Sequence, residues 1–488
     1  MRTFKRVQAV LLRFEWDMLG FGLCRAWISM VFTLPVPALL TMGSDFSLWY
    51  FVPGAVACLA FGLASGKIVT ERARTIALVA SAALSIVGVA GMLTGAHQGL
   101  SVLLVASLAS AGAGAALLQT LWGDKMAGMP IRDINLYTVA SMLFAALLSI
   151  LSWSVSSLDA ALLVFAMLPA GSCILLYRGF QAGRWPACRE IGRTEASPEQ
   201  SLLHLGRLCV SIFVFVFVFN FAYTTFPSNP LAGVDAQPIR SIANVGVTVA
   251  LLATLLARGS IDRMSLYRLS FPILLGALLL VLVVPDEHAG VASIIAATGY
   301  KLFDVLFWCV LVGLAHESQP RSWRVLGFGM AANFAGMGLG VGLRTWAQSA
   351  TSSGALDQTL IVCGLMFALA IVTMLILPES VIAQIASRGV KKQRQGDAPL
   401  SLRCSTLGDM RKLTAREREV LELLAQGRTQ SVIARKLSIS EGTAHTHIMH
   451  VYQKIDVHSQ QELIDVVESI SPDHDISSTP SPLSQPLR

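Results

Sequence analysis

Long apolar stretches separated by short polar segments dominate the first 377 residues. The hydrocarbon core of a bilayer takes a helix of about 20 apolar residues, and twelve stretches reach that length, which predicts twelve membrane-spanning helices. The predicted spans are 20–42, 47–66, 75–95, 100–122, 136–155, 159–177, 207–227, 239–257, 269–285, 289–316, 324–344 and 356–377. We therefore expect an all-α fold whose larger part is a polytopic helical membrane bundle over 20–377.

The basic residues between these stretches predict an orientation. Arg and Lys occur in the leader, 1–19, and then in every second loop, including the longest one, 178–206. The remaining loops hold only Arg240 and Arg344, both at span edges. Because cytoplasmic loops retain positive charge, both termini are predicted to be cytoplasmic.

The long loop divides the spans into two groups of six, 20–177 and 207–377. This layout resembles the major facilitator superfamily, in which a cytoplasmic loop joins two six-helix halves. The family's motif after the second span has the form G-x-x-x-D-R-x-G-R. The segment GLASGKIVTERAR lacks its aspartate, and RGSIDRMSLYR after the eighth span keeps Gly259, Asp262 and Arg263. The resemblance implies the fold of that family.

Composition agrees with a membrane protein and excludes several site types. Hydrophobic residues make up 54% of the chain and charged residues 14%, whereas soluble proteins carry about 25% charged residues. The mean hydropathy is +0.62. The eight cysteines form no CxxC or Cys/His pattern, so neither a disulfide framework nor a zinc module is predicted.

Charged residues within predicted spans are costly and often functional. Arg25 lies in the first span, and Lys301 and Asp304 lie in the tenth at a spacing that lets them pair with each other. One interpretation is that they form only a mutually satisfied pair. The other is that they bind a small polar ligand, with Arg25 attracting an anionic group.

The chain changes character after Pro378. Residues 378–412 are polar with an excess of basic residues and are predicted to be a linker, and the Ser- and Pro-rich segment 469–488 is predicted to be a disordered tail. Between them, 413–468 has the pattern of a compact domain of four helices. Thr414 and Glu417 form a capping box that starts the first helix.

The second and third helices of this domain form a helix-turn-helix. Thr429 starts the second helix, the residues Ser438–Ser440 form a short turn, and Ser440 caps the third helix. The buried stripe of the third helix is Ala444, Ile448, Val451 and Ile455. At 100° per residue, the opposite face carries Thr446, Met449 and Gln453, flanked by His445 and His450.

The sequence LTAREREVLELLAQGRTQSVIARKLSISEGTAHTHIMHVYQKIDVHSQQELIDVV resembles the DNA-binding domain of LuxR-type transcription regulators. The resemblance implies that double-stranded DNA is the partner and that the domain dimerises through its fourth helix. It assigns base contacts to the positions of His445, Thr446 and Met449, and phosphate contacts to those of Thr443 and Lys454. His447 matches the family's usual histidine, and its partly inward direction on the helix favours a structural role.

Metal binding is an alternative role for the histidines. Three imidazoles at 445, 447 and 450 point in different directions and do not converge, whereas His447 and His450 alone make a poor site. We therefore predict no metal and no cofactor. Six basic residues against eight acidic ones leave 413–468 at a net charge of −2, so one copy is expected to bind DNA weakly.

No enzyme motif is present in the sequence. The leading hypothesis is a transcription regulator of the bacterial inner membrane, whose membrane domain senses a small molecule and whose cytoplasmic module binds promoter DNA. The alternatives are a major-facilitator-type transporter with a regulatory C-terminal module, and a helix-turn-helix used only for protein contacts.

Overall fold

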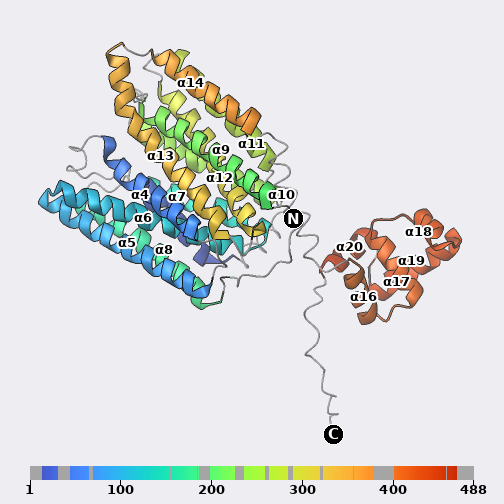
Figure 1. The fold of residues 1–488 in the computed structure, drawn as a ribbon. Coiled ribbons are helices and arrows are strands. Elements are labelled where there is room, and N and C mark those ends of the chain that lie inside the picture. Colours follow the sequence, from blue (N-terminus) through green and yellow to red (C-terminus); the bar gives the residue numbers. More distant parts are fainter. Residues whose placement is uncertain are drawn as a thin grey trace, which may run out of the picture. The chain divides into compact units, whose positions relative to one another are not determined.

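The computed structural model describes residues 14–30, 44–64, 70–152, 157–183, 185, 198–225, 236–258, 263–283, 289–318, 322–354, 357–376, 400–457 and 459–469. The predicted tail beyond residue 469 and the leader up to residue 13 lie outside them. All regular structure in these residues is helical (Figure 1). The chain forms two compact units, Met1–Gly389 and Val390–Arg488, and each is described by itself.

Unit 1 is a bundle of long apolar helices. Its elements are η1 (Trp16–Leu19), α2 (Gly20–Met30), η2 (Ser44–Ser47), α4 (Leu48–Ala64), α5 (Glu71–Gln98), α6 (Ser101–Ala127), α7 (Ile131–Ser152), α8 (Leu158–Gln181), α9 (Pro198–Thr225), α10 (Ala236–Arg258), α11 (Arg263–Val283), α12 (Ala289–Glu317), α13 (Ser322–Ser352), α14 (Gln358–Ile371) and the short π-helix η5 (Val372–Ile376). This bundle is the predicted polytopic membrane domain.

The predicted span count is supported in part. Seven helices of the described residues are long and apolar enough to cross a membrane, and four further apolar helices are shorter. The first predicted span is described only as α2, which ends at Met30. The predicted loop 178–206 is shorter than expected, because α8 extends to Gln181 and α9 begins at Pro198.

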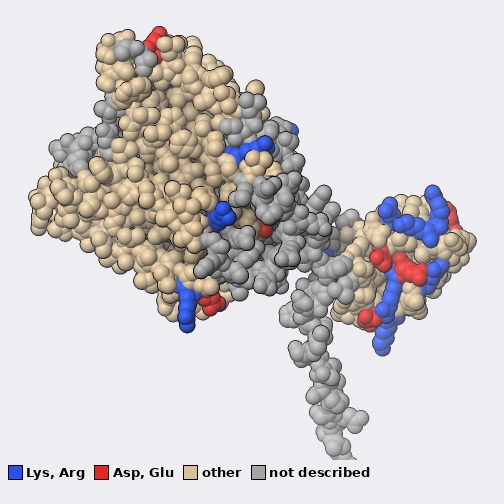
Figure 2. Space-filling model, viewed as in Figure 1, with Lys and Arg blue, Asp and Glu red and all other residues tan. Residues whose placement is uncertain are grey.

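Large apolar side chains are exposed along the described helices of unit 1, as on a lipid-facing surface. Val102, Ile76 and Ile86 are all more than two-thirds exposed. Figure 2 shows few charged side chains on the visible face of this unit. Since water would oppose such exposure, these side chains fit a hydrocarbon environment.

Small residues bring the helices of unit 1 into close contact. A Cβ atom on Gly112 of α6 would overlap the Tyr50 carbonyl of α4. A Cβ atom on Gly327 of α13 would lie 2.6 Å from the Cα atom of Gly62 in α4. Close backbone approach at small residues is typical of helix packing in membranes. Here it joins α4 of the first half to α13 of the second half.

The described residues of unit 2 form five short helices: α16 (Leu400–Met410), α17 (Ala415–Ala425), α18 (Gln430–Leu437), α19 (Glu441–Ile455) and α20 (Gln460–Ser469). The predicted capping box is present, with Thr414 accepting a hydrogen bond from the backbone of Glu417 and the Glu417 carboxylate accepting one from the backbone of Thr414. The predicted stripe of Ala444, Ile448, Val451 and Ile455 is buried.

Helix α16 corrects the prediction that 378–412 is a linker throughout. Leu400, Cys404 and Leu407 follow the spacing of one helical face, and Cys404 and Leu407 are buried in the core of unit 2. The excess of basic residues over 378–412 suggested a solvated segment, yet this face is apolar enough to pack against α17 and α20. The described part of unit 2 therefore begins at Leu400, before the predicted start at 413.

Candidate nucleic-acid interface and a buried charge cluster

Two local features determine where α18 ends and where α19 begins. Ser438 adopts the left-handed backbone conformation, with φ of 54°, and ends α18. The Ser440 hydroxyl then accepts a hydrogen bond from the Thr443 backbone at 3.1 Å and starts α19. Since the opposite side of α19 packs into the core, its polar face is directed to solvent.

The predicted contact residues all lie on exposed positions. Thr443, His445, Thr446, Met449, His450, Gln453 and Lys454 are exposed, whereas His447 is half-buried. Met449 presents 51% of its surface, although an apolar side chain of this size is more often covered. The exposed face is therefore the one derived from the helical spacing.

Contacts within unit 2 position several of these side chains. The Thr446 hydroxyl donates to the Gly442 carbonyl at 3.0 Å, and His445 Nδ1 lies 3.3 Å from Gln430 Oε1. Gln430 Nε2 also donates to the Glu441 carbonyl at 3.1 Å. Gln430, the first residue of α18, is thus a positioning residue that sequence reasoning missed. No local pattern marks its contact with His445, which lies 15 positions away.

Lys454 contacts a carboxylate that the sequence did not assign to it. Its Nζ donates to Glu417 Oε2 at 2.6 Å, and the same oxygen accepts from the Thr414 backbone at 2.8 Å. The Glu417 side chain is 5% exposed and that of Lys454 is 38% exposed. Lys454 thus fastens the end of α19 to the start of α17 while part of it remains open to solvent.

These contacts determine the charge state of Glu417. Burial of the carboxylate raises its pKa, but the hydrogen bonds from Lys454 and Thr414 and the charge of Lys454 outweigh burial and lower the pKa from 4.5 to about 2. Glu417 is therefore ionised at neutral pH and offsets the charge of Lys454.

Three exposed basic side chains lie around α18 in unit 2. Arg428, Arg435 and Lys436 are exposed there. In Figure 2 blue side chains gather at the end of unit 2 where Figure 1 places α18. These positive charges lie next to the face of α19, because α18 packs against α19. Among the described residues no group of three or more His, Cys, Asp and Glu side chains could hold a metal ion.

In unit 1 the three singled-out charges form one cluster. Arg25 Nη2 lies 2.5 Å from Asp304 Oδ2, and Lys301 Nζ lies 3.2 Å from the same oxygen. The pairing of Lys301 with Asp304 follows the predicted spacing. Arg25 comes from α2 in the first half, so Asp304 joins α2 to α12 in the second half. Two cations share one carboxylate, which leaves a formal charge of +1.

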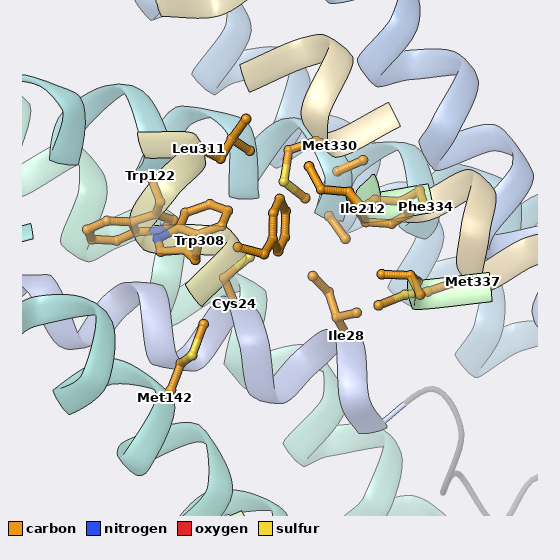
Figure 3. Packing of buried hydrophobic residues seen from close by; sticks show 14 of the residues in the cluster. Cys24, Ile28, Trp122, Met142, Ile212, Trp308, Leu311, Met330, Phe334 and Met337 are labelled. Carbon is orange, nitrogen blue, oxygen red and sulfur yellow. The ribbon is translucent and has the colours of Figure 1, made fainter. Parts of the chain in front are cut away.

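The cluster has an apolar and aromatic setting. Tyr300, next to Lys301, stacks on Phe219 at 3.9 Å between ring centroids, and Phe21 of α2 stacks on Trp308 of α12 at 4.5 Å. Figure 3 shows Cys24 and Ile28 of α2 directed into the same packed interior as Trp308 and Phe334. Because all three charged side chains are at most 15% exposed, their mutual interactions are weakly screened.

A second buried ion pair was missed. Arg74 Nε donates to Asp124 Oδ2 at 2.9 Å, and Trp185 Nε1 donates to the same oxygen at 3.0 Å. The Ser322 hydroxyl, at the start of α13, donates to the other oxygen at 2.6 Å. Arg74 and Asp124 lie just outside the predicted spans 75–95 and 100–122, whereas the structure places them within α5 and α6, almost fully buried. The hydrogen bond from Ser322 of α13 to Asp124 of α6 joins the second half to the first.

Comparison with known proteins defines the smaller unit. Residues 411–467 match the family described as bacterial regulatory proteins, luxR family. Sixty residues are 42% identical to the nitrate/nitrite response regulator protein NarL of Escherichia coli (strain K12), covering 12% of this chain and 28% of NarL. Fifty-two residues are 44% identical to the transcriptional regulatory protein DesR of Bacillus subtilis (strain 168), covering 11% of this chain and 26% of DesR. The chain thus matches about a quarter of the length of these relatives.

The larger unit is similar to solved membrane transporters. It aligns with a bacterial homologue of the iron transporter ferroportin in the outward-facing state at a TM-score of 0.54 and 12% identity, covering 76% of this chain and 97% of that one. For the major facilitator superfamily proton:xylose symporter XylE the TM-score is 0.51 and the identity 15%. The alignment covers 75% of this chain and 96% of the symporter. The chain therefore joins a bundle with the major facilitator fold to a LuxR-type helix-turn-helix domain, as predicted.

Proposed function

We propose that the protein is a membrane-anchored one-component transcription regulator. Unit 2 binds double-stranded promoter DNA through α19, and unit 1 senses a small molecule. The observation that carries the proposal is the union, in one chain, of a LuxR-type domain with an exposed polar α19 face and a helical bundle of the major facilitator fold. The protein is proposed to lie in the bacterial inner membrane with both termini cytoplasmic, so that unit 2 reaches DNA.

The α19 face has the chemistry that major-groove recognition needs. His445 and Thr446 offer hydrogen-bonding groups, and Met449 offers an apolar contact for a thymine methyl group. Thr443 at the helix start and Lys454 near its end supply phosphate contacts, and His450 and Gln453 extend the face. A homodimer formed through α20 doubles these contacts and strengthens the weak binding expected of one copy.

The charge cluster of unit 1 is the proposed sensor site. An anionic group that enters competes with Asp304 for Arg25, because the cluster has one cation more than it has carboxylates. Releasing Asp304 from Arg25 weakens a contact between α2 and α12, and hence between the two halves. A ligand shifts a conformational equilibrium when it binds one conformation more tightly than the other. An anion that replaces Asp304 at Arg25 would bind more tightly to the conformation in which this contact is broken.

A transcript comparison tests the regulator hypothesis. The wild-type strain is compared with one producing the double variant H445A/T446A and with one producing Q426A, which alters an exposed side chain at the end of α17. We expect a defined set of transcripts to change in H445A/T446A and to stay at wild-type levels in Q426A. Unchanged transcripts in both variants would refute regulation by this domain. A DNA footprint by unit 2 then separates DNA binding from a role in protein contacts alone.

Transport is the second candidate function. The fold of unit 1 is that of proteins described as an iron transporter homologue and a proton:xylose symporter. If unit 1 transports, proteoliposomes containing the full chain accumulate a solute that protein-free liposomes do not. Accumulation together with unchanged transcripts in H445A/T446A would favour the transporter over the regulator.

A further inference from the structure

Unit 1 has an apolar groove whose lining includes no residue of the charge cluster. Its volume is about 550 Å³, which is within the usual range of about 300–1,000 Å³ for small-molecule sites. The lining residues come from α4, α9 and α13: Ala55, Val56, Leu59, Leu205, Gly206, Cys209, Arg324, Phe328, Ala331, Ala332 and Ala335. Arg324 is the only charged residue among them.

The groove is open to the outside of the bundle. Val56 is 60% exposed and Leu59 is 43% exposed, and Ala332 and Ala335 are half-buried beside them. Apart from Arg324, the wall consists of small, aliphatic and aromatic side chains, with no acidic group. In a bilayer, the apolar part of such a groove admits a hydrocarbon chain.

Arg324 gives the groove one polar end. It lies in the first turn of α13 and is half-buried. Among the described residues, Arg324 makes no hydrogen bond and no ion pair with a side chain, whereas Arg25 and Arg74 in the same unit both have carboxylate partners. An arginine that lays its stem along apolar surface directs its charged head toward the membrane interface.

We propose that this groove binds an anionic phospholipid, with an acyl chain between α4, α9 and α13 and the phosphate on Arg324. A guanidinium group matches phosphate by charge and by paired hydrogen bonds. Under the predicted orientation the start of α13 faces the cytoplasmic leaflet, whose surface is rich in anionic lipid. The lipid would contact both halves, since α4 belongs to the first half and α9 and α13 to the second. The proposal is independent of the proposed regulatory function.

Native mass spectrometry of the purified full-length protein tests the proposal. Phosphatidylglycerol and phosphatidylethanolamine with identical acyl chains are added separately. We expect one tightly held phosphatidylglycerol on the wild type, and about fivefold weaker binding of it to R324Q, the loss typical of one basic group at a membrane surface. Filling the groove with A335F should weaken binding of both lipids. R178Q removes an exposed arginine from α8 and should bind as the wild type does.

A native thiol provides a second readout, which carries an internal reference in each sample. Cys209 lines the groove, and Cys363 in α14 is exposed elsewhere. Phosphatidylglycerol should slow maleimide labelling of Cys209 relative to Cys363 in the wild type, and much less in R324Q. Equal lipid binding by R324Q and the wild type, equal losses in R324Q and R178Q, or no preference for phosphatidylglycerol over phosphatidylethanolamine would each overturn the proposal.

Discussion

Lys454, near the end of α19, donates a 2.6 Å hydrogen bond to Glu417 in the first turn of α17. The same carboxylate completes the capping box with Thr414. The buried Glu417 carboxylate thus contacts both the start of α17 and the far end of α19. This arrangement gives Lys454 two roles, one within the fold and one proposed at the DNA backbone.

Replacing Glu417 by glutamine should flatten the acid dependence of stability. The pKa of Glu417 in the folded chain, about 2, lies below its ordinary value of 4.5. Its contribution to stability is therefore fully present above about pH 4.5 and is lost as the pH falls toward 2. We expect E417Q to cost about 1–2 kcal/mol at pH 7, because hydrogen bonds to charged groups contribute about 1.5–3 kcal/mol and solvent screens the partly exposed Lys454.

The measurement is urea unfolding of a fragment starting at residue 390, between pH 7 and pH 2.5. E419Q is the matched control, because Glu419 pairs with Arg416 on the surface with its side chain 50% exposed. We expect E419Q to follow the wild type at every pH. A loss of stability in acid that is as steep in E417Q as in the wild type would contradict the assignment.

Helix α16 should be part of the folded domain. Truncating Leu407 to alanine removes a side chain that is 2% exposed in the core of unit 2, and such truncations cost about 2–5 kcal/mol. M410A, three residues further along, alters a side chain that is 61% exposed and should change stability by less than about 0.5 kcal/mol. Thermal unfolding of the fragment followed by circular dichroism distinguishes the two. If L407A were as stable as M410A, α16 would not be packed in solution.

The charge cluster of unit 1 predicts an order of stability among its variants. D304N leaves Arg25 and Lys301 buried together without a carboxylate, and breaking a buried pair in this way costs about 3–5 kcal/mol. K301Q should cost much less, because the 2.5 Å contact between Arg25 and Asp304 remains. Fluorescence-detected thermal unfolding in detergent measures the order. D159N, at a position where the side chain is 79% exposed, is the control and should match the wild type.

Sequence patterns predicted what depends on neighbours along the chain. The pairing of Lys301 with Asp304 follows from their spacing on one helix, and the stripe from Ala444 to Ile455 follows from helical periodicity. Arg25, in contrast, is 279 positions from Asp304. Nothing local could show that the first and tenth predicted spans place these charges together. The sequence showed only that Arg25 and Asp304 are both charged residues within apolar predicted spans.

Two of the missed features also depend on contacts between residues that are far apart in the sequence. Glu417 was correctly identified as a capping residue, but its partner Lys454 lies 37 positions away on another helix. Gln430 contacts His445 only because the turn at Ser438 folds α18 against α19. The apolar face of α16 was visible in the spacing of Leu400, Cys404 and Leu407. It was hidden by the excess of basic residues around it, which suggested a solvated linker.

The two roles of Lys454 can be separated by salt dependence. K454Q should weaken DNA binding and reduce the slope of log affinity against log salt by about 1, because one phosphate contact is lost. It also leaves the Glu417 carboxylate buried without its cation and should therefore destabilise the domain. The double variant E417Q/K454Q removes both charges, so it should regain stability without regaining affinity.

E417Q alone provides the opposite test of the same contact. It removes a negative charge and releases the Lys454 ammonium group, so its affinity for DNA should equal or exceed that of the wild type. R411Q, which removes an exposed charge outside the α19 face, serves as the control and should keep the wild-type slope. Affinities are measured by fluorescence anisotropy between 50 and about 200 mM salt, the range over which phosphate contacts dominate. A wild-type slope in K454Q would restrict Lys454 to its structural contact with Glu417.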